Sequence, residues 1–80
     1  DQDKNEKALE MGSKALKKGD IKRPDQLYIV LGMANANLKK YDASLKYLKQ
    51  AKEDKRSEKF ASQWITFVEA EQAREKQLAM

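Results

Sequence analysis

The chain contains no cysteine and no histidine among its 80 residues, and it has only one proline and three glycines. The two missing residue types exclude disulfides, thiol chemistry, a histidine general base and the usual zinc and iron ligands. Apolar runs extend over only a few residues, so the sequence predicts neither a membrane span nor a signal peptide. Because the chain begins with aspartate, we expect it to be a piece of a longer protein.

Charged residues make up 38% of the chain, and 17 basic against 13 acidic side chains give a formal charge of +4. The two signs are interspersed, which is typical of solvated helices and predicts an all-α fold. An excess of lysine also leaves open a nucleic-acid or anionic surface as partner. The chain has no glycine-rich phosphate loop, no nucleophile with a histidine partner and no metal-spaced cluster, so we predict neither an enzyme nor a bound cofactor.

Apolar residues recur at helical spacing in four segments, which predicts about four helices. Gly19 is expected to end the first in a left-handed conformation, Pro24 to begin the second, and Ser57 to cap the fourth. A short connection between the second and third favours an antiparallel pair. The expected segments cover residues 3–18, residues 24–38, residues 42–53 and residues 58–78.

The pattern also repeats within the chain. A displacement of 34 residues lays Leu27, Leu31 and Ala34 over Ala61, Ile65 and Val68. A similar displacement lays the first segment over the third, so that two kinds of helix, B and A, alternate in the order B, A, B, A. Periods in the thirties are typical of solenoids in which helix pairs stack on their neighbours.

With this period and this order of helices, the chain resembles a tetratricopeptide repeat protein, whose unit is a helix–turn–helix of about 34 residues. The resemblance implies a right-handed solenoid of antiparallel helix pairs in a single domain. Residues 1–19 would be helix B of a truncated repeat, residues 24–56 one complete repeat, and residues 57–80 a C-terminal capping helix. The matching residues are Leu31, Gly32, Ala34, Tyr41, Leu45, Leu48 and Ala51.

Glycine in a helix interior costs about 0.5–1 kcal/mol relative to alanine, so Gly32 needs a reason. The resemblance implies that helix A at Gly32 meets helix B of the preceding repeat, on the face that contains Gly12 and Ala15. Some positions depart from the family pattern, and a buried asparagine among them would need a hydrogen-bond partner. The departures are Asn35 for an aromatic residue, Ser44 for alanine, Lys39 for glycine and Arg56 for proline.

A longer stretch, residues 18–69, is similar to the C-terminal region of bacterial repeat proteins encoded beside TonB, ExbB and ExbD energy-transduction components. This similarity implies a periplasmic accessory of a TonB system. Without this similarity the sequence does not identify the compartment, and the cytoplasm is the alternative to the periplasm.

In the tetratricopeptide family the concave face is lined mainly by A helices and binds a peptide or protein. Ile29 and Met33 lie outside the packing stripe, so either a partner groove or burial against the last helix explains them. The rings of Phe60, Trp64 and Phe67 either close the end of the core or contact a partner. The expected partner-binding residues are Gln26, Ile29, Met33, Asn37, Phe60, Gln63, Trp64 and Phe67.

A first helix without its own A partner should expose an apolar strip near Leu9, Met11 and Leu16, which a homodimer would cover. The function expected from these patterns is a non-catalytic protein-interaction scaffold. Two alternatives remain: a basic helical domain that binds nucleic acid, and a purely structural cap on a longer repeat array.

Overall fold

A computed structural model describes residues 2–79 of the chain, and these residues form helices and connections without any strand. The all-α prediction with about four helices is confirmed. The helices are α1 (Gln2–Lys18), α2 (Pro24–Asn37), α3 (Tyr41–Lys52) and α4 (Lys55–Leu78). Among the residues described, no helix is long and apolar enough to cross a membrane.

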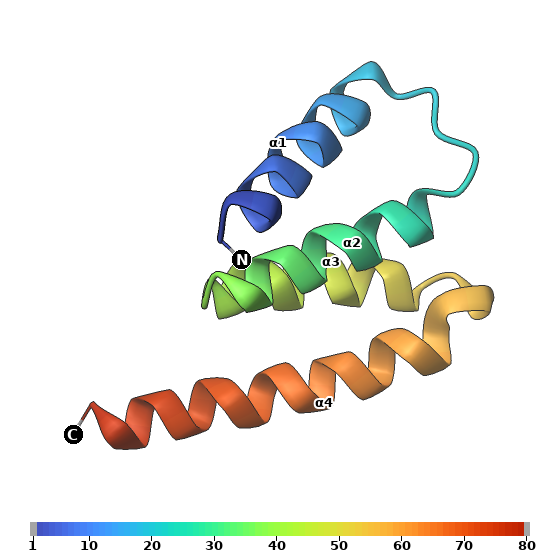
Figure 1. The fold of residues 1–80 in the computed structure, drawn as a ribbon. Coiled ribbons are helices and arrows are strands. Elements are labelled where there is room, and N and C mark those ends of the chain that lie inside the picture. The colour runs from blue at the N-terminus through green and yellow to red at the C-terminus, as the bar shows by residue number, and fades with distance from the viewer. Residues whose placement is uncertain (1, 80) are drawn as a thin grey trace.

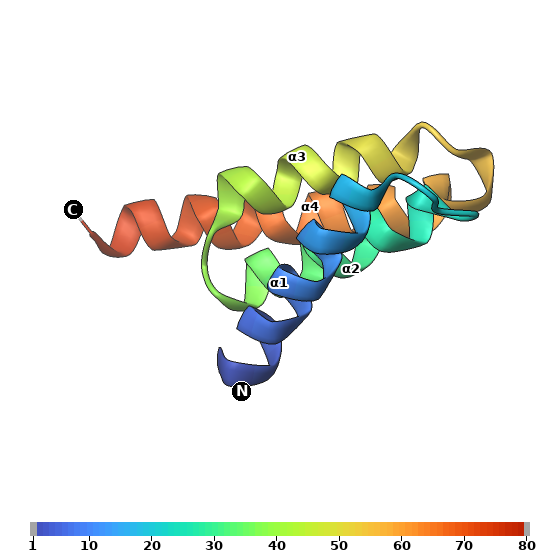
Figure 2. The same ribbon diagram turned by 90° about the horizontal axis from the view of Figure 1, so that it is seen from above.

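Helices α2 and α3 form an antiparallel hairpin at the centre of the molecule (Figure 1). Helix α4 runs along this hairpin and contacts both of its helices, and its C-terminal turns extend beyond the hairpin (Figures 1 and 2). Helix α1 crosses the opposite side of α2 at an angle. Within residues 2–79, α2 is the only helix that α1 contacts.

The core lies between α3 and α4, where Leu45, Leu48 and Val68 form a buried cluster. Small residues let the helices approach, since Ala51 and Ala61 are fully buried at the same contact. A buried aliphatic side chain contributes about 1.5–3 kcal/mol, so these few residues supply much of the stability of the hairpin and α4. Partly buried residues around the cluster are Ile29, Ala36, Tyr41, Trp64 and Ile65.

The two helical glycines each make room for a leucine, but not as the sequence predicted. A Cβ atom on Gly32 would lie 2.7 Å from Cγ and Cδ2 of Leu48, on α3. Gly32 therefore meets its own hairpin partner, and the prediction that it meets α1 was wrong. The contact between α1 and α2 depends instead on Gly12, whose Cβ would lie 2.5 Å from Cδ2 of Leu31. Periodicity shows that a small residue lies on a packed face without showing which helix packs there.

Two helix ends follow the predicted chemistry. Gly19 has a φ of 77° and donates its N–H to the Ala15 carbonyl, which confirms the left-handed end of α1. Helix α2 begins at Pro24 as predicted. It ends in a Schellman motif, in which the Lys40 and Lys39 N–H groups donate to the Asn35 and Ala36 carbonyls.

Lys39 itself has a φ of 62°, a left-handed conformation that glycine adopts more readily than other residues. Among the residues described it is the only non-glycine with a positive φ.

The start of α4 differs from the prediction. Asp54 is the N-cap residue, and its carboxylate accepts a hydrogen bond from the Arg56 N–H at 2.9 Å. Ser57, the predicted cap, lies inside the helix and is buried. Its hydroxyl donates to a buried carboxylate on α2, a partner that sequence patterns near Ser57 do not reveal.

The other departures from the repeat pattern also have a structural place. Asn35 is 4% exposed, and its Nδ2 donates to the Leu31 carbonyl one turn earlier at 2.8 Å, which supplies the partner that a buried asparagine needs. Ser44 is fully buried, and its hydroxyl donates to the Gly32 carbonyl at 2.7 Å. Both polar side chains are therefore buried with a hydrogen-bond partner.

Candidate interaction surface on α2 and α4

Three aromatic side chains form a row on one flank of α4, at the spacing of successive helical turns. The Phe60 and Trp64 ring centroids are 6.3 Å apart, and the Trp64 and Phe67 rings meet edge to face at 5.4 Å. Trp64 is half-buried and packs against the core cluster. Phe60 and Phe67 are 47% and 53% exposed, so the row is partly core and partly open surface.

The predicted residues on α2 are also divided between core and surface. Ile29 is half-buried and packs against the core cluster, in line with the burial alternative. Met33 is half-buried, whereas Gln26 and Asn37 are exposed. The side-chain Nδ2 of Asn37 donates to the side-chain Oδ1 of Asn5 on α1 at 3.2 Å, so this side chain already has a partner within the chain.

Val30 was not among the predicted residues, yet it is 48% exposed. It completes a row on α2 that runs through Gln26, Val30, Met33 and Asn37 at steps of four, three and four residues. This spacing places the four side chains on one helical face. This spacing was already visible in the sequence. Val30 could have been identified as a β-branched residue that lies outside the packing stripe of its helix.

Two neighbouring hollows share Phe67. One is lined by Gln63, Trp64 and Phe67. The other lies between the end of α2 and the second half of α4, and it brings Asn37 and Phe67 together. Gln26 and Phe60 line neither hollow. Around the second hollow the lining residues are Ala36, Asn37, Lys39, Tyr41, Phe67, Val68, Glu71, Arg74 and Glu75.

Charges at the second hollow are matched in pairs. Lys39 Nζ lies 3.5 Å from a carboxylate oxygen of Glu75, and Arg74 Nη2 lies 2.5 Å from one of Glu71. All four side chains are at least partly exposed, so each pair contributes about 1 kcal/mol or less to stability. The hollow therefore combines apolar side chains with polar groups whose charges balance one another.

A buried carboxylate joins the starts of α2 and α4. Asp25 is 2% exposed and accepts two hydrogen bonds from the Arg23 guanidinium, at 2.9 and 2.7 Å, and one from the Ser57 hydroxyl at 2.6 Å. The Arg23 bonds first, and the Ser57 bond second, hold the pKa of Asp25 far below its usual range. This network fixes the two helices that form the candidate surface relative to each other.

The network was missed at the sequence level, because its members are far apart in the chain. Asp25 suits the first turn of a helix by its charge alone, and Ser57 suits a helix cap. Only the approach of α4 to α2 makes them partners across 32 residues.

Residues 2–79 contain no group of three or more acidic, histidine or cysteine side chains placed to hold a metal ion. What the surface does offer is aromatic and aliphatic side chains at helical spacing, with amide groups at their margins.

No family model, curated protein or solved structure matches the chain.

Proposed function

We propose that the chain is a non-catalytic protein-interaction module that binds a partner peptide or protein on the face formed by α2 and α4. The observation that carries the proposal is a pair of half-exposed rings on α4, of which Phe67 lines both hollows and Phe60 lies beside Trp64 in the same aromatic row. Fully burying such a ring contributes about 1.5–3 kcal/mol, so covering the exposed half of each contributes about 1 kcal/mol. Val30 and Met33 lie on the row of α2 that ends at Asn37, and Asn37 lines the second hollow together with Phe67.

A tetratricopeptide-type scaffold is the form of module that we propose. Supporting it is the order of helix contacts, in which α1 packs on α2, α2 on α3, α3 on α4, and α2 also on α4. Stacked helix pairs make contacts of this kind, between neighbours in the chain and between successive A helices. The burial of Ala61 and Val68, which correspond to Leu27 and Ala34 in the 34-residue displacement, also supports it.

A narrower form of the proposal is that the parent protein serves a TonB system in the periplasm. This form rests on the resemblance of residues 18–69 alone, since no curated protein matches the chain. Fractionation of cells that carry the tagged parent tests it directly: recovery in the cytoplasmic fraction would contradict this form and leave the interaction module itself untouched.

The proposed surface is tested by affinity capture with the tagged chain and mass spectrometry. The test variant replaces Phe60 and Phe67 with serine. A control replaces Leu78, which is 77% exposed and lies outside the surface, with serine. We expect a partner that the wild type and the control retain and the test variant loses.

If every captured protein survives the double phenylalanine substitution, the surface is not the binding site. Circular dichroism of both variants checks that the helices remain folded, so that a lost partner reports on the surface and not on unfolding.

A further inference from the structure

The outer side of α1 carries lysines that no helix covers. Lys7, Met11, Lys14 and Lys18 are all exposed, and they follow one another at steps of four, three and four residues. At about 100° per residue, the three lysines fall within about 40° around the helix axis. The acidic residues of α1, which are Asp3, Glu6 and Glu10, all lie to one side of this row. We call Lys7, Met11, Lys14 and Lys18 the cationic row.

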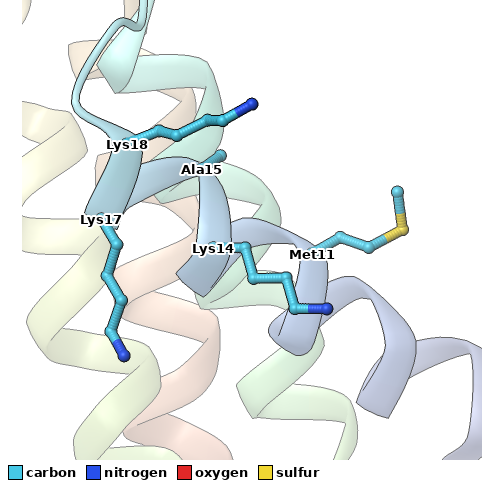
Figure 3. Close-up of a pocket in the computed structure, with 5 residues that line it drawn as sticks. All are labelled: Met11, Lys14, Ala15, Lys17 and Lys18. Atoms are coloured by element: carbon cyan, nitrogen blue, oxygen red, sulfur yellow. The ribbon is translucent and has the colours of Figure 1, made fainter.

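The second half of α1 is where this charge is least compensated. Glu10 pairs with Lys14 at 3.3 Å, and between Glu10 and Asp20 the chain has no acidic residue. A shallow hollow lies there, lined by Met11, Lys14, Ala15, Lys17 and Lys18. Figure 3 shows Met11, Lys14 and Lys18 extending to one side of α1, with Lys17 pointing in a different direction.

The walls of this hollow are mainly aliphatic, because the stems of the lysines and the Met11 side chain line it while the ammonium groups reach its rim. Met11 is 71% exposed, so an apolar side chain placed against it would remove further apolar surface from water. An apolar floor with a cationic rim complements an apolar side chain that has carboxylates beside it.

Two other anionic partners fit less well. A single-stranded nucleic acid binds best where aromatic side chains stack on its bases, and α1 has no aromatic residue. An anionic membrane needs a broad apolar face on the helix, but Leu9 and Leu16 are half-buried and only Met11 stands open. The predicted apolar strip on α1 is thus reduced to Met11, which is too little for insertion into lipid or for a homodimer seam.

We propose that the cationic row of α1 binds an acidic protein segment in which one large apolar residue lies between carboxylates. The apolar residue occupies the hollow at Met11 and Ala15, and the carboxylates pair with Lys14, Lys18 and Lys7. This site is separate from the face formed by α2 and α4, so either can fail without the other.

The probe is a short synthetic peptide of glutamates around one central leucine, titrated into the isotope-labelled chain and followed by amide chemical shifts. The test variant replaces Lys7, Lys14 and Lys18 with glutamine. The control replaces Lys46, Lys49 and Lys52 of α3, which are equally exposed but spread over about 120° around their helix. Both variants lose the same charge.

We expect shifts in residues 7–18, a Kd that weakens about tenfold in the test variant and much less in the control, and weaker binding as salt rises. A peptide with serine in place of leucine should bind the wild type more weakly, and Met11→Gln should remove that difference.

Equal weakening in the two variants would show nonspecific attraction and overturn the site. No saturable binding would overturn it as well. Tighter binding of a single-stranded oligonucleotide, or of vesicles that contain phosphatidylserine, to the same row would overturn the choice of an acidic protein segment. The chain with serine at positions 60 and 67 is expected to bind the peptide as the wild type does, which separates this outcome from that of the proposed function.

Discussion

Replacing Gly32 with alanine tests the closest approach in the hairpin. The new methyl group would lie 2.7 Å from two atoms of Leu48 and 3.4 Å from the Ser44 carbonyl oxygen. Leu48 is fully buried, so it has little room to move away. Overpacking of this kind costs about 1–3 kcal/mol, against a helix-propensity gain of about 0.5–1 kcal/mol for alanine. We expect a net loss of about 1–2 kcal/mol in the free energy of unfolding, and a larger loss for Gly32→Leu.

Urea denaturation followed by far-UV circular dichroism measures this loss, and a double-mutant cycle assigns it. Leu48→Ala alone should cost about 2–5 kcal/mol. In the double variant Gly32→Ala, Leu48→Ala, the methyl group gains space, so the combined loss should fall short of the sum by about 1 kcal/mol or more. Two results would refute the close approach of α2 and α3. One is a Gly32→Ala protein that is more stable than the wild type by the full helix-propensity difference. The other is a double variant whose loss of stability equals the sum of the two single losses.

Three further predictions concern polar groups and helix ends. The pKa of Asp25 is lower in the folded chain than its unfolded value of about 3.9, so the folded state binds fewer protons. Its stabilising effect is complete above about pH 5 and is lost as the pH falls through about 4 and below. Asp25→Asn should lower the unfolding midpoint at neutral pH and flatten this acid dependence; an unchanged acid profile would contradict the role of the carboxylate. Lys39→Gly should raise stability by about 0.5–1 kcal/mol by relieving the left-handed strain, less any loss from the Lys39–Glu75 pair, as measured by urea titration. Asp54→Ala should lower the thermal midpoint by about 5 °C through loss of the N-cap, as seen by thermal denaturation, whereas Glu58→Ala on the first turn should change it little.

Local chemistry in the sequence predicted the helices well. Pro24 and Gly19 mark a beginning and an end by their backbone preferences, and apolar spacing identified the four segments and the burial of Leu31, Leu48 and Val68. These signals act within one turn of the residue that carries them. That range explains why the helix bounds differ from the prediction by only a few residues.

Relations between helices were harder to predict. The face that contains Gly32 was recognised as packed, yet the helix opposite it was misassigned, because a stripe of small residues fits either neighbour. The same limit hid the Asp25–Ser57 contact, which needs the crossing of α2 and α4. Among the candidate surface residues, Phe60 and Phe67 were found as ring positions, but their half-exposure depends on how far α4 lies from α2.

The position of α1 has a consequence for the order in which the molecule opens. Helix α1 is held by one neighbour, through Gly12 against Leu31 and through Asn5 against Asn37, whereas α2, α3 and α4 hold one another. Local unfolding begins where the fewest buried contacts must break. Amide protons of α1 should therefore exchange with solvent well before those of the remaining helices, and proteolysis should begin at the connection of residues 19–23. The chain thus consists of a three-helix unit that opens as a whole and a first helix that detaches from it at a lower free energy.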